Sequence, residues 1–206
     1  MNEKSKSEII NIRRSQLIKA AYRVLSKKGY HDFTIRDIAK EANLSTGLVH
    51  YYFKNKQDLL VSVLKDINEN LRRFLDKSFE QLDSPVEKLR VFMTHAFELA
   101  KDEEYFSVIF DFWTLSNNND RMHRANMKLL KSYRDECRRI IEEGIRQGVF
   151  NTIDVEYTTA IIISVIQGMI IQYVIDKGAF DYDEYAEKVT KQIFVLLVKK
   201  DGNKKS

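Results

Sequence analysis

Apolar residues recur every three or four positions along most of the chain, which is the spacing of one face of an α-helix. The first run covers residues 9–28 and ends at Gly29. Two shorter runs follow, one that begins at Thr34 and one that covers about residues 45–52. We find no stretch in which apolar and polar residues alternate for long enough to predict a β-strand. The pattern therefore predicts an all-α protein.

Helix-capping residues mark where several of the predicted helices begin. The Thr34 hydroxyl can accept a hydrogen bond from the N–H of Asp37, whose carboxylate can return one to the Thr34 N–H. Ser45 can cap the next helix. The cap pattern recurs at residues 55–58 and, with a proline at the first helical position, at residues 84–87.

Six longer helices are predicted after the third run. They begin at residue 55 and then cover about 85–101, 103–116, 120–147, 154–177 and 183–199, which gives about nine helices in all. A polar break at residues 116–119 separates two of them, and the polar tail 199–206 is expected to fray. The apolar stripe of the helix that starts at residue 55 is Leu60, Leu64, Ile67, Leu71 and Phe74. The stripe of the last helix is Val189, Ile193, Leu196 and Leu197.

The composition fits a globular protein of one or two domains, because 44% of the 206 residues are hydrophobic and 31% are charged. The single cysteine, Cys137, excludes an internal disulfide and fits a reducing cytoplasm. No secretion signal is visible near the N-terminus. The most apolar stretch, residues 160–171, is shorter than the roughly 20 residues that span a membrane. We therefore expect a cytoplasmic protein without a membrane partner.

The charge is unevenly distributed along the chain. Residues 1–56 contain 12 Lys and Arg against 5 Asp and Glu, a balance of +7. Residues 57–206 contain 22 against 25, a balance of −3. A basic first quarter suggests that this part meets a polyanion, although a basic, solvated helix face has the same composition.

Two short helices joined by a three- to four-residue turn describe a helix-turn-helix. The second of them presents Thr46, His50 and Tyr51 outward while Val49 faces inward. Gly47 lowers helix stability by about 1 kcal/mol relative to Ala. Its presence is easier to explain if a DNA sugar-phosphate approaches the backbone closely. Taken alone, this block is better explained as an ordinary helical hairpin.

The segment 29–60 resembles the N-terminal DNA-binding domain of TetR-family transcriptional repressors, and the similarity covers about residues 12–60. It rests on a Thr-x-Arg-Asp-Ile-Ala helix, a Ser-x-Gly start, a Tyr-x-Phe run and a Lys-x-x-Leu entry, which begin at Thr34, Ser45, Tyr51 and Lys56. The resemblance implies a helix-turn-helix domain at residues 1–56 and a helical effector-binding and dimerisation domain at residues 57–206.

The resemblance also implies a set of DNA-binding residues, namely Thr34, Arg36, Ser45, Thr46, Gly47, His50, Tyr51 and Lys56. Thr34 stands at a helix N-terminus, where free N–H groups can hold a phosphate. Tyr51 and Lys56 match residues that contact the DNA backbone. Thr46 and His50 are candidates for reading base edges in the major groove. His50 replaces the family's common Tyr, so a purine, a phosphate and water are all open as its contact.

A recognition helix this short needs two copies for specificity, which implies a homodimer on a palindromic double-stranded DNA operator. The helix at 154–177 is apolar on opposite sides and needs more than one partner. Gly168 can allow a close crossing of helices. The predicted dimer interface, in the family's eighth and ninth helices, is Ile162, Ile166, Met169, Tyr173, Val189, Ile193 and Leu197. A helix fully buried in a monomer is the alternative.

The middle helices are rich in aromatic and Met residues, which most often form a core. The resemblance implies an apolar pocket for a small-molecule effector that releases the repressor from DNA. The predicted ligand-binding residues are Phe92, His95, Phe106, Phe110, Trp113, Met127, Tyr133 and Gln167. Trp113 with nearby rings can cage a quaternary ammonium, and a long cavity can equally take an acyl chain. Both classes of effector remain open.

Rival functions are weakly supported by the sequence. None of the four histidines pairs with Asp, Glu or Cys in a known catalytic pattern. Asp120 and His123 are too few for a metal site, and no Walker or dinucleotide glycine pattern occurs. We therefore expect no enzymatic activity, no metal and no cofactor. The alternatives are an activator of the same family and a helical interaction module whose basic head binds acidic proteins.

Overall fold

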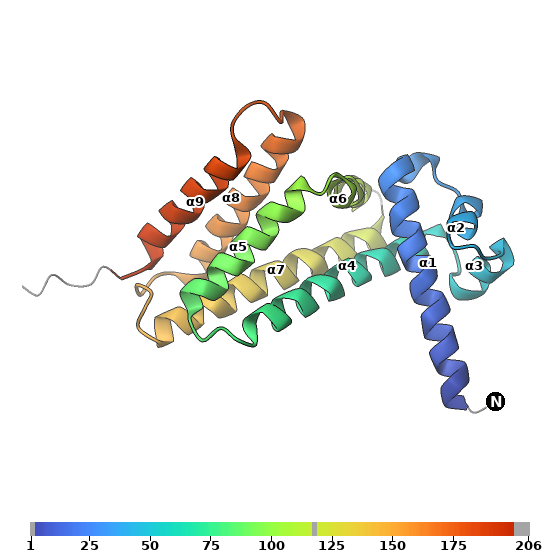
Figure 1. Cartoon of the computed structure of the whole chain (residues 1–206), viewed down its shortest axis with the longest axis horizontal. Helices are drawn as coiled ribbons and strands as arrows, with labels where there is room; N and C mark the ends of the chain where they lie inside the picture. The colour runs from blue at the N-terminus through green and yellow to red at the C-terminus, as the bar shows by residue number, and fades with distance from the viewer. Residues whose placement is uncertain (1–2, 117–118, 200–206) are drawn as a thin grey trace, which may run out of the picture. The chain divides into compact units, whose positions relative to one another are not determined.

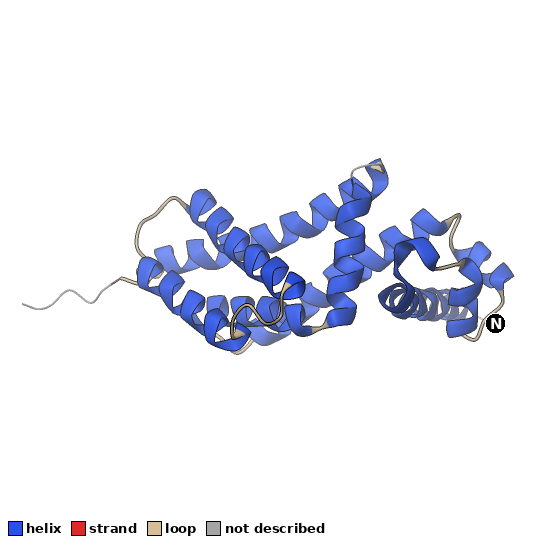
Figure 2. Cartoon of the chain, turned by 90° about the horizontal axis from the view of Figure 1, so that it is seen from above, coloured by secondary structure: helices blue, strands red, loops and turns tan. Residues whose placement is uncertain are grey.

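The computed structural model describes residues 3–116 and 119–199 and is helical almost throughout (Figure 1, Figure 2). Its helices are α1 (Glu3–Asp32), α2 (Ile35–Glu41), α3 (Thr46–Tyr52), α4 (Lys56–Phe79), α5 (Pro85–Lys101), α6 (Glu103–Leu115), α7 (Asp120–Arg146), α8 (Val155–Ile175) and α9 (Tyr182–Leu197). Over the described ranges no strand forms, and an isolated bridge joins Phe150 to Val198. The all-α prediction is confirmed. Asn117, Asn118 and residues 200–206, where a break and a frayed tail were expected, lie outside the described residues.

The predicted caps are present at the starts of several helices. The Asn55 side chain accepts a hydrogen bond from the Asp58 N–H at 2.9 Å. The Asp154 carboxylate caps α8 by accepting one from the Tyr157 N–H at 2.9 Å. The last helix begins slightly earlier than predicted, because Asp181 rather than a later residue is its N-cap.

The chain divides into two compact units. The first unit consists of Met1–Leu71 and Asp102–Leu129, and the second of Arg72–Lys101 and Leu130–Ser206. Both α4 and α7 contribute residues to each unit. The domains predicted from the sequence, residues 1–56 and 57–206, were defined by function, whereas these units are defined by compactness. The predicted domain boundary therefore stays a prediction.

In the first unit α1 packs against α2 and α6, and α2 packs against α3 (Figure 1). Leu17 of α1, Ile38 of α2 and Val49 of α3 are completely buried in this core. Gly29 interrupts α1 with a positive φ of 69°, a conformation that glycine adopts without strain. The N–H of the next residue, Tyr30, donates to the Asp111 carboxylate of α6 at 2.8 Å. The kink therefore ties the end of α1 to α6.

In the second unit α5 lies beside both α8 and α9 (Figure 1). The core is formed by the buried faces of these three helices together with the later part of α7. Its members include Leu89, Phe92, Met93, Cys137, Ile140, Ile141, Ile162, Ile166, Met169, Ile193 and Leu197. Burial of such side chains is the main source of the free energy that stabilises the fold.

Two residues of the predicted apolar stripes are exposed rather than buried. Phe74 of α4 is exposed and stacks on His95 of α5, with 3.8 Å between the ring centroids. Leu196 of α9 is 70% exposed, whereas its neighbour Leu197 is buried. Leu196 and Leu197 are 100° apart on the helix, and of the two it is Leu197 that faces the core.

The apolar helix α8 contains the apolar stretch 160–171 and extends beyond it at both ends. It covers 21 residues and is, within the described part of the chain, the one helix long and apolar enough to cross a membrane by length and composition. The expectation that this stretch is too short is therefore wrong. Its buried residues, such as Ile162 and Ile166, belong to a side of the helix that packs on α5.

Candidate DNA-binding and effector sites

The start of α2 is held by a complete capping box. The Thr34 hydroxyl accepts a hydrogen bond from the Asp37 N–H at 3.2 Å, and the Asp37 carboxylate accepts one from the Thr34 N–H at 2.9 Å. Lys28 donates to the same carboxylate at 2.7 Å. The hydrogen bonds from Lys28 and then Thr34 lower the pKa of Asp37 to about 2. Since the Thr34 hydroxyl is engaged in this box, its contact with a phosphate stays a prediction.

Helix α3, the predicted recognition helix, presents one polar and one buried face. Ser45 caps it by accepting a hydrogen bond from the Leu48 N–H at 3.2 Å. Val49 is buried, as predicted, and Phe53, the C-cap at the end of the helix, is buried as well. His50 is exposed, and the side chain of Tyr51 is 70% exposed. Thr46 and, at the start of α2, Arg36 are also exposed. The polar side of α3 is therefore free of contacts with the core.

Gly47 is the second residue of α3 rather than a residue in its middle. A Cβ atom added there would meet nothing closer than the Ser45 hydroxyl, at 3.9 Å. The packing of the chain therefore gives no reason for a glycine at this position. A close approach from outside the protein does give one.

Lys56, the predicted phosphate-binding lysine, points its ammonium group into the protein. It donates to the backbone carbonyls of Tyr30 at 2.9 Å and Phe33 at 3.2 Å. The ammonium also lies 4.5 Å and 3.7 Å from the centroids of these two rings. Burial lowers the pKa of Lys56. Its contact with DNA stays a prediction, and the structure adds a second role, which is to fix the end of α1 to the start of α4.

Four of the predicted ligand-binding residues belong to the first unit. Phe106, Phe110 and Trp113 form an aromatic cluster along α6, with centroid distances of 6.0 Å between the two phenyl rings and 6.4 Å from Phe106 to Trp113. Phe106 is buried, but Phe110 is exposed. Met127 of α7 is 54% exposed, so it does not line the interior as expected.

The other four belong to the second unit. Phe92 is buried, and His95 stacks on Phe74, where burial lowers the pKa of the imidazole. Tyr133 and Gln167 are half-buried. Because the eight residues are divided between two units, their meeting in one pocket stays a prediction.

The predicted dimer interface needs a correction. Ile162, Ile166, Met169, Ile193 and Leu197 are all buried inside their own unit, so they are not available to a second copy. Tyr173 and Val189 are half-buried. The exposed large apolar residues of α8 and α9 are instead Tyr157, Ile161, Ile171, Ile175, Tyr185, Val195 and Leu196. Periodicity shows that α8 has two apolar faces, but it does not show which of them meets the core.

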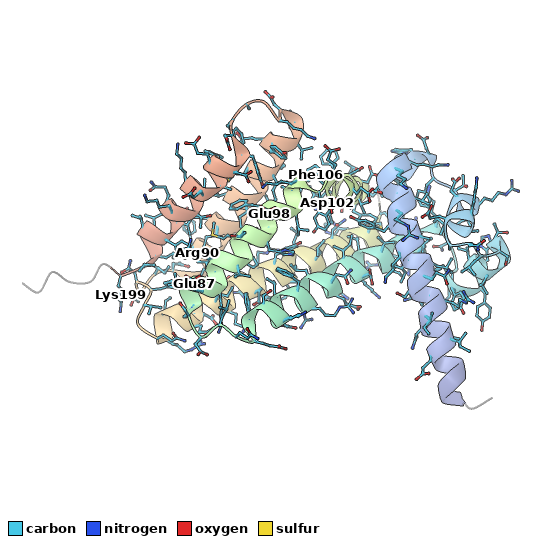
Figure 3. All side chains as sticks on the ribbon, in the orientation of Figure 1. Glu87, Arg90, Glu98, Asp102, Phe106 and Lys199 are labelled. Carbon is cyan, nitrogen blue, oxygen red and sulfur yellow. The ribbon has the colours of Figure 1, made fainter. Side chains whose placement is uncertain are left out.

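A groove in the second unit lies between α5 and α9 and has a volume of about 560 Å³. Arg90 and Glu98 of α5, which are labelled in Figure 3, line it together with Phe194 of α9. The Arg90 guanidinium lies 4.9 Å from the Phe194 ring centroid. Lys101 pairs with Glu98 and with Asp183, and these hydrogen bonds raise the pKa of the lysine. Two cations, Arg90 and Lys191, and three carboxylates, Glu98, Asp183 and Glu187, line the groove, so it offers no excess of positive charge.

A second groove lies within the first unit, between α4 and α7, and has a volume of about 230 Å³. Four cationic side chains line it, namely Lys65, Arg121, Arg124 and Lys128. None of these residues was predicted from the sequence to form a site. A detectable signal was the placement of three basic residues on one face of α7, at positions i, i+3 and i+7.

The thiol of Cys137 lies in the core of the second unit. Burial raises the pKa of this thiol to about 12, so it stays protonated near neutral pH. A protonated, buried thiol is a poor nucleophile.

The fold and the exposed face of α3 define a helix-turn-helix transcriptional regulator. Residues 17–63 match the family model of bacterial regulatory proteins of the tetR family, and residues 85–197 match the model of the C-terminal domain of BetI-type transcriptional repressors. The chain therefore belongs to the TetR family.

Individual relatives agree with this assignment. The chain is 27% identical over 170 residues to the fatty acid metabolism regulator protein of Bacillus subtilis, which covers 81% of this chain and 86% of that protein. A TetR transcription regulator from Haloarcula marismortui has a similar structure, with a TM-score of 0.82 at 23% identity over 92% of this chain and 100% of the other. The transcriptional regulator FadR from Bacillus subtilis, solved in complex with stearoyl-CoA, also has a similar structure. Its TM-score is 0.75 at 26% identity, and the match covers 88% of this chain and 98% of that chain.

Proposed function

We propose that this TetR-family regulator is a cytoplasmic repressor that binds a palindromic operator as a homodimer and leaves it when a small molecule binds. The exposed polar face of α3 carries the proposal, because it lies opposite the buried Val49 and Phe53 and contains a glycine that packing does not require. The balance of +7 over residues 1–56 favours binding to a polyanion. In this proposal residues 1–56 bind DNA and residues 57–206 bind the effector and a second copy.

The exposed apolar residues of α8 and α9 are the proposed dimer surface. Large apolar side chains that stay in contact with water are costly, and a contiguous group of them is typical of an interaction surface. Ile161 and Ile171 lie on the side of α8 that also contains Gly168. A Cβ at Gly168 would meet nothing within 4 Å, so the backbone is open to a helix from a second copy.

We infer an acyl compound as the first effector to test. The relative from Bacillus subtilis is a fatty acid metabolism regulator, and FadR was solved with stearoyl-CoA. The cluster of Phe106, Phe110 and Trp113 favours a quaternary ammonium as the second candidate, because aromatic rings attract cations. Release of a labelled operator by palmitoyl-CoA, with choline in a parallel titration, separates the two.

The mutation Gly47→Ala tests the DNA-binding face. Alanine removes a helix-destabilising residue without a clash. We therefore expect the free energy of unfolding to stay the same or to rise by up to about 1 kcal/mol. We expect operator affinity to fall at least about tenfold, because the added methyl group stands where the sugar-phosphate backbone would approach. Fluorescence anisotropy with an operator from a random-site selection measures the affinity.

The matched control for this experiment is Gly178→Ala, which adds the same methyl group far from α3 in the sequence. Wild-type operator affinity is expected for this control. If Gly47→Ala binds the operator as tightly as the control does, the proposed close approach of DNA to α3 is wrong.

A further inference from the structure

The groove between α4 and α7 in the first unit has an apolar base and a cationic rim. Val61 and Leu64 of α4 and Ala125 and Leu129 of α7 provide the apolar surface. The cations are Lys65 of α4 and Arg121, Arg124 and Lys128 of α7. No Asp or Glu lines the groove.

These positive charges are largely unbalanced. Arg121 pairs with Asp58 at 3.3 Å. Among residues 3–116 and 119–199, no ion pair or hydrogen bond joins the side chains of Lys65, Arg124 or Lys128 to another residue. Like charges gathered around one concavity repel each other and create a positive potential that an anion relieves.

Asn68 of α4 is a further unsatisfied group at this site. It lines the groove, and its buried side-chain oxygen has no hydrogen-bond partner in the described structure. A buried acceptor without a partner is unfavourable by about 1–3 kcal/mol. A small rotation of the amide would let a hydroxyl or N–H group of a ligand donate to it.

We propose that this groove binds the phosphate groups of an acyl-CoA effector. The inference rests on the proposed function and deepens it, since it selects phosphorylated acyl thioesters over free fatty acids and over quaternary ammonium compounds. Arg and Lys form charge-assisted hydrogen bonds with phosphate oxygens, whereas a rim of four cations repels a cationic ligand. The volume of about 230 Å³ suits the phosphate-bearing part of such a ligand and not the whole molecule.

The position of the groove gives the bound phosphate a route to the DNA-binding helices. Lys65 belongs to α4, which begins at Lys56, four residues after the end of α3. Lys56 in turn holds the carbonyls of Tyr30 and Phe33 beside the start of α2. A phosphate that draws Lys65 toward Arg124 and Lys128 would therefore shift α4 relative to its resting position, and α3 with it.

The experiment compares two double variants on the same helix. R124Q/K128Q removes two charges from the groove, and K131Q/R134Q removes two charges from the next turns of α7. Neither Lys131 nor Arg134 lines the groove. Isothermal titration calorimetry on the full chain uses palmitoyl-CoA, coenzyme A and palmitoyl-pantetheine, which has the acyl thioester but no phosphate. Operator release by each probe is measured in parallel.

We expect R124Q/K128Q to weaken the binding of palmitoyl-CoA and coenzyme A at least about tenfold, and of palmitoyl-pantetheine by less than about twofold. The control variant should bind all probes like wild type. Asn68→Asp, which places a carboxylate in the groove at nearly constant volume, should also weaken the two phosphorylated probes selectively.

Three results would overturn the phosphate site. One is that R124Q/K128Q loses affinity equally for palmitoyl-pantetheine and palmitoyl-CoA. Another is that this variant loses affinity for neither probe. The third is a loss of operator affinity in R124Q/K128Q with unchanged binding of coenzyme A, which would assign these cations to DNA. In each case release of the operator by palmitoyl-pantetheine would leave the proposed function standing. Selective loss of coenzyme A binding without operator release by any probe would support the site and reject an acyl compound as the effector.

Discussion

Asp37 connects three parts of the helix-turn-helix through one carboxylate. It accepts hydrogen bonds from the Thr34 N–H and hydroxyl and from the Lys28 ammonium of α1. These bonds require the ionised form, so they lower the pKa from 3.8 to about 2. The folded protein therefore binds a proton at Asp37 less readily than the unfolded chain does.

The mutation Asp37→Asn should remove a pH-dependent part of the stability. In wild type, the contribution of the carboxylate is fully present above about pH 4 and is lost as the pH falls toward about 2. We expect the variant to be less stable than wild type at pH 7, and the difference to shrink as the pH approaches 2. Urea denaturation between pH 7 and pH 2.5 measures this, and Lys28→Met serves as a variant that removes the hydrogen bond from the Lys28 ammonium. Parallel pH profiles for wild type and Asp37→Asn would contradict it.

Lys56 marks how far single residues of the site could be predicted from the sequence. The motif placed it correctly at the start of α4, and the same reasoning placed Val49 inward and Tyr51 outward, as the structure confirms. The carbonyls that Lys56 binds are 23 and 26 residues away in sequence. Contacts over such separations depend on the tertiary fold, so a local motif does not contain them.

At the scale of elements, the end of α7 packs against the ring of Phe150, which leaves no room for a side chain at Gly144. Phe150 is fully buried, and a Cβ at Gly144 would lie only 2.1 Å from its Cδ2 atom. The chain turns between them at Gly148, where φ is +74°, and the Phe150 N–H donates to the Gly144 carbonyl at 3.0 Å. The turn thus fixes the ring over the glycine.

The mutation Gly144→Ala should therefore destabilise the protein, although alanine is the better helix former. We expect a loss of about 1–3 kcal/mol in the free energy of unfolding, since a fully buried ring must move. Replacing the ring by a smaller side chain in Gly144→Ala/Phe150→Leu should recover part of that loss relative to the sum of the single changes. Chemical denaturation of the four proteins measures the coupling, and a stabilised Gly144→Ala protein would contradict the close contact.

The helix starts that carry a cap were well predicted because their signals are local, whereas α1 begins earlier and continues past Gly29. Caps such as Ser45 and Asp154 act on N–H groups three residues away, so the sequence contains both partners. The faces of the helices were harder to assign. Both sides of α8 are apolar, and the choice between Ile161 and Ile162 as the buried residue depends on where α5 lies.

At the scale of the whole molecule, this choice decides how two copies would assemble. Ile162 is 1% exposed in its own unit, whereas its neighbour Ile161 is 45% exposed. A surface that joins two copies must be accessible in each single copy before assembly. The face of α8 that contains Ile161, with Val195 and Leu196 of α9, meets that condition.

Substitution of these two neighbours by aspartate should consequently have different effects. We expect Ile161→Asp to fold with wild-type helicity but to raise the dimer dissociation constant at least about a hundredfold, because a carboxylate would be desolvated at the interface. Ile162→Asp should instead unfold the second unit by burying an unpaired charge in the core.

Sedimentation equilibrium and circular dichroism distinguish a folded monomer from an unfolded chain. A folded Ile161→Asp protein that remains fully dimeric, or a folded Ile162→Asp protein that becomes monomeric, would return the interface to the buried face. Operator affinity should follow the dimer, since a single recognition helix reads too few base pairs to bind the operator tightly.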